Sequence, residues 1–137
     1  MLISGAKYPT TVTSQGLRGF DTVRRLTRGL DGVEESTAYG SPCLKVNGHM
    51  FACIAINKEA EPNTLMIRVT SFEQRDELIA EQPDVYYLKP HYEPGACVLV
   101  RLGRVPDDAL RDLLRAAWKD ASSRRPAAAR KKRRAPR

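Results

Sequence analysis

Long apolar runs, a glycine-rich phosphate loop and a paired set of cysteines are all missing from this 137-residue chain. Without about 18 consecutive apolar residues, no segment predicts a membrane-spanning helix. The N-terminus also lacks the apolar stretch of roughly 7 to 15 residues that a signal peptide needs. The missing phosphate loop removes one indication of a nucleotide-dependent enzyme. We therefore expect a cytoplasmic protein, and the length corresponds to about one domain.

The cysteines are three in number, far apart, and each set in an apolar strand pattern: Cys43, Cys53 and Cys97. This pattern predicts buried, reduced thiols. Neither His49 nor His91 lies at metal-ligand spacing from a cysteine, so we expect no metal and no cofactor. A nucleophilic cysteine paired with His91 would lack a third, orienting residue and the electropositive surroundings that a thiolate needs. We therefore expect a protein that is not an enzyme.

The positive charge is gathered at the C-terminal end of the chain. Lysine and arginine number 23 against 16 aspartate and glutamate, but without the eight cations of residues 124–137 the balance is 15 against 16, a net charge of −1. These eight cations are Arg124, Arg125, Arg130, Lys131, Lys132, Arg133, Arg134 and Arg137. The segment has no large apolar group to offset the entropy of ordering, so we expect a disordered basic tail.

Three helices are predicted inside a domain at residues 17–123, preceded by a polar, flexible leader at residues 1–16. Apolar residues spaced three and four apart indicate the first helix, from Phe20 to Leu30. Ser71 begins a capping box for the second helix. Asp107 has the position of an N-cap for the third, which carries an apolar stripe toward the sheet.

Between and after these helices the pattern changes to short β-branched and aromatic runs separated by turn residues, which predicts strands. The predicted strands are residues 35–39, 43–46, 50–56, 65–69, 85–88 and 96–102. The run at 50–56 is apolar on both sides, as expected for a central strand covered on both faces. Asn47-Gly48 predicts a tight hairpin turn, and the polar loop from Asn57 to Asn63 a projecting wing. The expected fold is α+β, with two layers: about six antiparallel strands packed with three helices.

Several motifs occur in an order that resembles the MmcQ/YjbR family over roughly residues 18–120. They are Gly32-Val33-Glu34-Glu35, Tyr39-Gly40-Ser41-Pro42, Lys45-Val46-Asn47-Gly48, Pro83-Asp84-Val85-Tyr86-Tyr87, Pro90-His91-Tyr92 and a closing helix ending at Trp118. The resemblance implies a YjbR-like fold similar to secretion-chaperone-like domains, and DNA binding through a double-wing arrangement. The chain departs from the pattern at Ala96-Cys97, where many relatives carry a tryptophan, and in its long basic tail.

Strand alternation suggests a basic surface on the body itself. If the aliphatic residues of these strands face the core, then Lys45, Arg68 and Arg101 all face the other way. Three strands would then offer one cation each to a shared polyanion platform. The alternative is that these cations pair across strands with acids such as Glu35 and contribute little.

The loops beside this face complete the candidate site. His91 and Tyr92 could stack on a base or hold a phosphate, whereas the alternative is that His91 satisfies nearby backbone groups. The body residues proposed beside the three strand cations are His49, Lys58, Lys89, His91 and Tyr92.

The basic tail predicts the partner. Eight cations neutralising phosphates would release condensed counterions, which gives non-specific affinity for DNA with a salt slope of up to about −7. RNA is the related alternative. A tail without any partner, acting as a solubilising extension, is the simplest other interpretation. The rival function is a chaperone-like, protein-interaction module whose tail binds an acidic protein. We expect a monomer or weak dimer without membrane contact.

Overall fold

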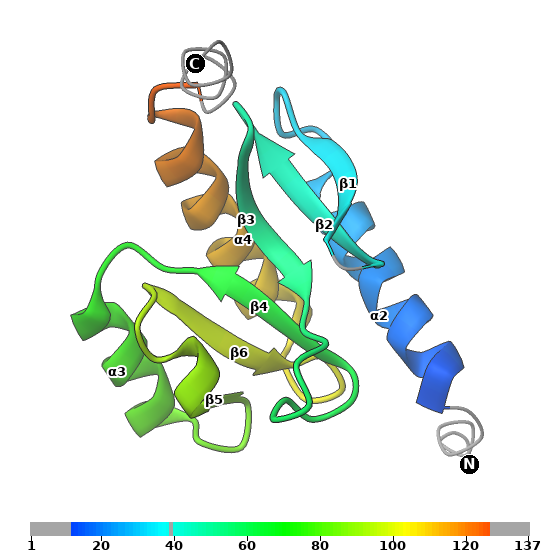
Figure 1. The fold of residues 1–137 in the computed structure, drawn as a ribbon, viewed down its shortest axis with the longest axis vertical. Helices are drawn as coiled ribbons and strands as arrows, with labels where there is room; N and C mark the ends of the chain where they lie inside the picture. The colour runs from blue at the N-terminus through cyan, green and yellow to red at the C-terminus, as the bar shows by residue number, and fades with distance from the viewer. Residues whose placement is uncertain (1–11, 39, 127–137) are drawn as a thin grey trace, which may run out of the picture.

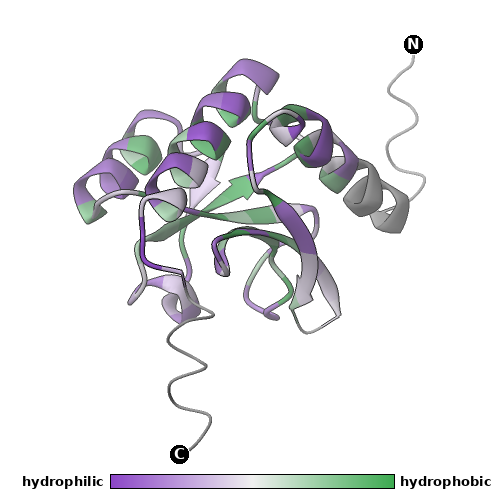
Figure 2. Ribbon diagram, turned by 90° about the horizontal axis from the view of Figure 1, so that it is seen from above, coloured by the Kyte–Doolittle hydropathy of each residue, from purple (hydrophilic) through white to green (hydrophobic). Residues whose placement is uncertain are grey.

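The computed structural model describes residues 12–38 and 40–126. Three helices, α2 (Val12–Thr27), α3 (Phe72–Glu81) and α4 (Asp107–Ser122), lie over one face of a single sheet (Figures 1 and 2). Within the part of the chain that the structure describes, no helix combines the length and apolar character needed to cross a bilayer.

The sheet has six strands in the order β1-β2-β3-β4-β6-β5, and every neighbouring pair is antiparallel. The strands are β1 (Glu34–Ala38), β2 (Ser41–Val46), β3 (His49–Ile54), β4 (Thr64–Arg68), β5 (Tyr86–Tyr87) and β6 (Cys97–Arg101), with the short helix η1 (Pro90–Tyr92) before β6. This architecture confirms the predicted two-layer α+β fold.

Apolar side chains fill both faces of the sheet. The main core lies between the helices and the sheet, where Phe20 and Leu114 pack with Ile67 of β4, all fully buried. A smaller cluster on the helix-free face contains Cys53 and Met66. From Ala52 to Ala55 successive residues alternate between the two clusters, which confirms that this strand is covered on both faces. Figure 2 shows the three helices stacked on one side and the loops on the other.

The first helix is longer at its start than predicted. It begins at Val12, so residues 12–16 are helical and the prediction of a loose leader is wrong for them; residues 1–11 lie outside the described part. Extending an existing helix adds one hydrogen bond per residue without a new nucleation step, so a segment with weak helix propensity can join a helix that has already formed. The helix ends at Thr27, before Gly29, which has a left-handed φ of 99°.

The starts of α3 and α4 also differ in detail from the prediction. Ser71 Oγ accepts from the Gln74 backbone N–H at 3.0 Å, as predicted, but the Gln74 side chain accepts from the backbone N–H of Thr70. Asp107 is the first residue of α4, not its N-cap, because Pro106 holds the cap position. The Asp107 carboxylate instead forms an ion pair with Arg25 of α2 at 3.1 Å, which joins the two helices.

The turn between β2 and β3 forms as predicted. Asn47 and Gly48 both have positive φ, 57° and 78°, as a two-residue type I′ hairpin requires. This conformation places the Asn47 side chain and the first residue of β3, His49, beside the end of α4.

Candidate nucleic-acid interface

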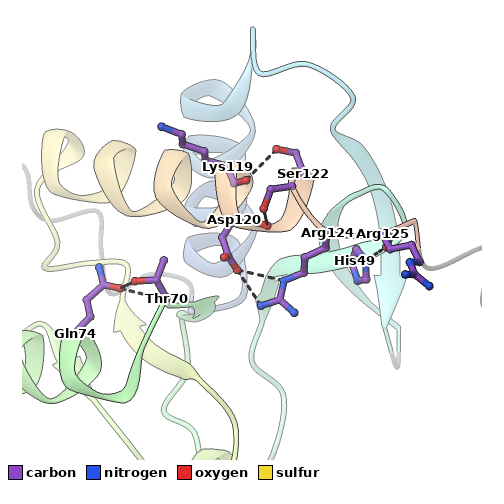
Figure 3. A network of polar contacts seen from close by, with 9 residues as sticks. His49, Thr70, Gln74, Lys119, Asp120, Ser122, Arg124 and Arg125 are labelled. Carbon is purple, nitrogen blue, oxygen red and sulfur yellow. Dashed lines mark hydrogen bonds and ion pairs between the residues drawn. The ribbon is translucent and has the colours of Figure 1, made fainter.

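The start of the basic tail is held against the β2–β3 hairpin. Asn47 Nδ2 donates to the carbonyl of Ser122 at 2.9 Å and more weakly to that of Arg124 at 3.4 Å. His49 Nε2 donates to the carbonyl of Arg125 at 2.6 Å (Figure 3). Carbonyls at a helix C-terminus have no partner within the helix, so these side chains satisfy groups that would otherwise face water. They also set where the tail leaves the body.

The last turn of α4 directs the first tail arginine. The guanidinium of Arg124 donates to Asp120 Oδ2 through Nη2 at 3.1 Å and Nε at 3.3 Å (Figure 3). Both side chains are partly exposed, so the pair contributes a few tenths of a kcal/mol at most. The ion pair holds the Arg124 side chain beside His49 and Met50 at the start of β3. Arg125 is exposed and has no ion pair with any other described residue.

Arg68 lies beside this tail base. A cavity of about 110 Å³ is lined by Arg68, Arg124 and Asp120 together with His49, Met50, Ala117 and Ala121. Arg68 is exposed, and among the described side chains it has no ion-pair partner. One strand cation of the body and one cation of the tail therefore border the same hollow, with a single carboxylate between them.

Lys45 is at the same end of the sheet. It is the register partner of Met50, one residue from His49. Lys45 and Arg68 lie on strands separated by β3, which places their backbones about 10 Å apart. The cross-strand neighbour of Lys45 is Glu34, yet no ion pair joins them in the described part of the chain. We name Lys45, His49, Arg68, Arg124 and Arg125 together the tail corner.

Arg101 does not belong to this group. It lies opposite Thr64 on β4, whereas Arg68 lies opposite Cys97. The four-residue separation along the strands amounts to about 14 Å. The alternation of faces was predicted correctly, but the single platform of Lys45, Arg68 and Arg101 is split between two ends of the sheet.

Arg101 is also fully engaged. Its guanidinium forms a bidentate pair with Glu61, at 2.8 and 2.7 Å. Nη1 donates to the carbonyls of Pro83 and Asp84, and the group lies 4.3 Å from the centroid of the Tyr87 ring. The hydrogen bond from Arg101 is the main cause of the lowered pKa of Glu61. The predicted alternative of ion pairing applies here, with Glu61 as the acid.

Glu35 has a different partner from the one suggested. It accepts two hydrogen bonds from Arg24 of α2, at 2.8 and 2.7 Å, and Arg24 also pairs with Asp21. The hydrogen bond from Arg24 lowers the pKa of Glu35. This cluster joins the edge strand β1 to α2 and leaves Lys45 without a role in it.

The loop from Asn57 to Asn63 is hydrogen-bonded to the body of the protein. The backbone N–H of Glu61 donates to the Tyr87 hydroxyl at 2.8 Å, and the Glu59 carboxylate accepts from the backbone N–H of His91 at 3.1 Å. Lys58, Glu59 and Glu61 are exposed, as expected for a polar loop, but the two glutamates have partners on β5, β6 and η1, and the projection of this loop as a wing stays a prediction.

The remaining predicted residues gather around this loop, at the opposite end from the tail corner. Lys58 is exposed and Lys89 half-buried. His91 is exposed, and its ring meets Tyr92 edge-on with centroids 4.9 Å apart. Tyr92 packs against the small cluster on the helix-free face, so its ring is not free to stack on a base.

The three cysteines are free and buried, as predicted. Burial is the main cause that raises the pKa of Cys53 to about 11, and burial also raises that of Cys97. A thiol with a raised pKa holds little thiolate at neutral pH and is a poor nucleophile. Within the described residues, no group of three histidine, cysteine or acidic side chains is placed to hold a metal.

Sequence reasoning missed Asn47 and Asp120, which position the tail. The Asn47-Gly48 pair signals a turn, and a turn asparagine can also use its amide for capping. Asp120 stands four residues before Arg124, a spacing that predicts an ion pair on a helix. The other tail cations, Arg130, Lys131, Lys132, Arg133, Arg134 and Arg137, lie outside the described residues.

The comparisons with known proteins agree with this fold. The YjbR family model matches residues 28–120, which is more than half of the chain. The chain belongs to the YjbR family. A solved structure of Deinococcus radiodurans protein DR2400, with a DUF419 domain, is similar to this YjbR protein at 26% identity and a TM-score of 0.59, covering 72% of this chain and 75% of the other. The search of curated proteins gives no match. The family match ends at Asp120, before the basic tail.

Proposed function

We propose that this YjbR-family protein is a non-enzymatic nucleic-acid-binding protein, with DNA as the first partner to test. Its affinity comes from the basic tail and the tail corner together. One observation carries the proposal: Asn47 and His49 hold the start of the tail beside Arg68. Cations of tail and body thereby share one edge of the molecule.

The physical basis is release of counterions. The body has a net charge of −1 without the tail, so a basic surface must come from local grouping. At the tail corner four cations, Lys45, Arg68, Arg124 and Arg125, stand with two nearby carboxylates, those of Asp120 beside Arg124 and of Glu34 opposite Lys45. Such contacts reach phosphates and carry no sequence information, so the binding is largely non-specific.

The three reduced thiols fit a reducing compartment, and a cytoplasmic location with access to nucleic acid is part of the proposal. The protein acts as a monomer or weak dimer. Neither role requires a cofactor.

The test is a salt series with the full chain and with a chain that ends at Ser123. The full chain should bind duplex DNA with a steep loss of affinity as salt rises. Removing eight cations should lower the magnitude of the slope of log affinity against log salt by up to about 7. Repeating the series with duplex RNA separates the two nucleic acids.

A control with half of that charge change replaces four cations outside the tail and its corner, Arg28, Lys58, Lys89 and Arg104, by glutamine. This variant should retain most of the slope, because total charge alone would act only through weak, screened attraction. An unchanged slope after tail removal contradicts the proposal. Equally tight binding to an acidic protein that survives nuclease treatment would favour the rival, chaperone-like function.

A further inference from the structure

A second cavity lies on the helix-free face of the sheet, away from α2, α3 and α4. Its volume is about 420 Å³. The floor is formed by interior strands: Cys53 of β3 faces its register partner Met66 of β4. The sides come from Ala55, Ile56 and Asn57 after β3, and from η1. Ile56 is 49% exposed, a large apolar side chain left at the rim.

The wall of this cavity is built in advance of any ligand. The Tyr92 hydroxyl contacts the backbone of Asn57, and the His91 backbone N–H donates to Glu59 at 3.1 Å. These two contacts join η1 to the β3–β4 loop. A cavity whose walls are already fixed loses little conformational entropy when a ligand enters.

One polar group stands at the rim of the cavity without a partner. Among the described residues, the His91 imidazole has no hydrogen-bond partner, and its ring is oriented by the edge-on contact with Tyr92, at an interplanar angle of 84°. Mostly apolar walls with a few polar groups, here Asn57 and His91, are typical of small-molecule sites.

The cavity does not suit an added peptide strand. Its floor strands β3 and β4 are interior, with β2 and β6 on their outer sides, so their backbone groups are already paired. Strand addition requires a free sheet edge. For scale, a dry cavity of about 150 Å³ holds one benzene ring, so this volume corresponds to roughly two or three rings.

We propose that this cavity binds a small planar aromatic molecule of two or three fused rings whose single polar group hydrogen-bonds to His91. Met50 and Met66, which are flexible and polarisable, line the cavity and suit aromatic faces. This site is separate from the tail corner except at Met50, which borders both cavities.

The test uses 2-naphthol as the probe and the full, isotope-labelled chain, followed by amide chemical shifts. Binding should saturate with one site, and the shifts should centre on residues 53–57 and 91–92. Ala55→Leu fills the cavity and should weaken binding at least tenfold. Ala80→Leu, the same change on the exposed face of α3, should leave it within twofold.

Two further variants keep the test decisive if Ala55→Leu folds poorly. Ile56→Ala removes an exposed part of the wall and should weaken binding about threefold. His91→Phe keeps an aromatic ring without a polar group, so affinity for 2-naphthol should fall about fivefold while that for naphthalene stays unchanged. Absence of saturable binding, shifts centred elsewhere, or equal affinities in Ile56→Ala and the unmodified chain would overturn the proposal.

Discussion

Arg68 and Arg101 stand on paired strands and face the same side of the sheet, yet the protein uses them differently. Arg101 donates four hydrogen bonds and covers an aromatic ring, whereas Arg68 is exposed beside the start of the tail with no ion pair to another described residue. The difference follows from which loops lie nearby. The β3–β4 loop brings Glu61 to Arg101, whereas within residues 12–38 and 40–126 no acidic loop residue pairs with Arg68. One arginine is structural, and the other is available to a partner.

Replacing the two arginines should separate stability from binding. Arg101→Ala breaks the bidentate pair and leaves the carbonyls of Pro83 and Asp84 without their donor, so the free energy of unfolding should fall by about 2 kcal/mol. Arg68→Ala should change it by less than about 0.5 kcal/mol, as for an exposed site without partners. Urea unfolding measures the free energy of unfolding of both variants. Equal losses would contradict the different roles assigned to the two arginines.

Asn47→Gly should weaken nucleic-acid binding without disturbing the hairpin. Glycine tolerates the φ of 57° at this position, but it lacks the amide that holds the Ser122 carbonyl. Without this hydrogen bond the first residues of the tail are less ordered, which should lower DNA affinity about two- to threefold. Asn63→Gly is the matched control, since Asn63 also has a positive φ, 60°, at the opposite end of β4. Similar losses of DNA affinity in both variants would argue against a role of the Asn47–Ser122 hydrogen bond in binding.

Lowering the pH should destabilise the folded protein by weakening the Glu61–Arg101 ion pair. The pKa of Glu61 is lowered in the folded protein from its usual 4.5, so the stabilising contribution is present above that pH and is lost as pH falls through the folded value. Glu61→Gln should therefore flatten the fall in stability below about pH 4.5 by a few tenths of a kcal/mol, because the pair is partly exposed. Parallel pH profiles for variant and unmodified chain would contradict this.

The periodicity of the sequence was sufficient to predict the faces of the strands. Leu65 and Ile67 alternate with Met66 and Arg68, and the structure places the two sets on opposite sides. Hydrophobic burial fixes this alternation, since a shift of one residue would move every apolar side chain into water. The same reasoning identified the fold, the Asn47-Gly48 hairpin and the buried cysteines.

The arrangement along the strands could not be predicted in the same way. Register decides that Arg68 and Arg101 stand at opposite ends, and it depends on turn geometry and on contacts between distant segments. Glu61 and Arg101 are 40 residues apart, and Asn47 and Ser122 are 75 apart. No local pattern marks such pairs. The sequence thus predicted which residue types form the candidate site and which face of the sheet they occupy. It did not predict which of these residues lie together at one end of the sheet.

The most direct test of the account removes two cations from each end of the sheet in the full chain. Lys45→Gln with Arg68→Gln should lower DNA affinity by about tenfold and reduce the magnitude of the salt slope by about 2, the value for two lost phosphate contacts. Lys58→Gln with Lys89→Gln, an equal change of charge at the other end, should leave affinity within about twofold because these side chains lie away from the tail corner. Equal losses from both pairs, or a larger loss from Lys58 and Lys89, would contradict the assignment of nucleic-acid binding to the tail corner.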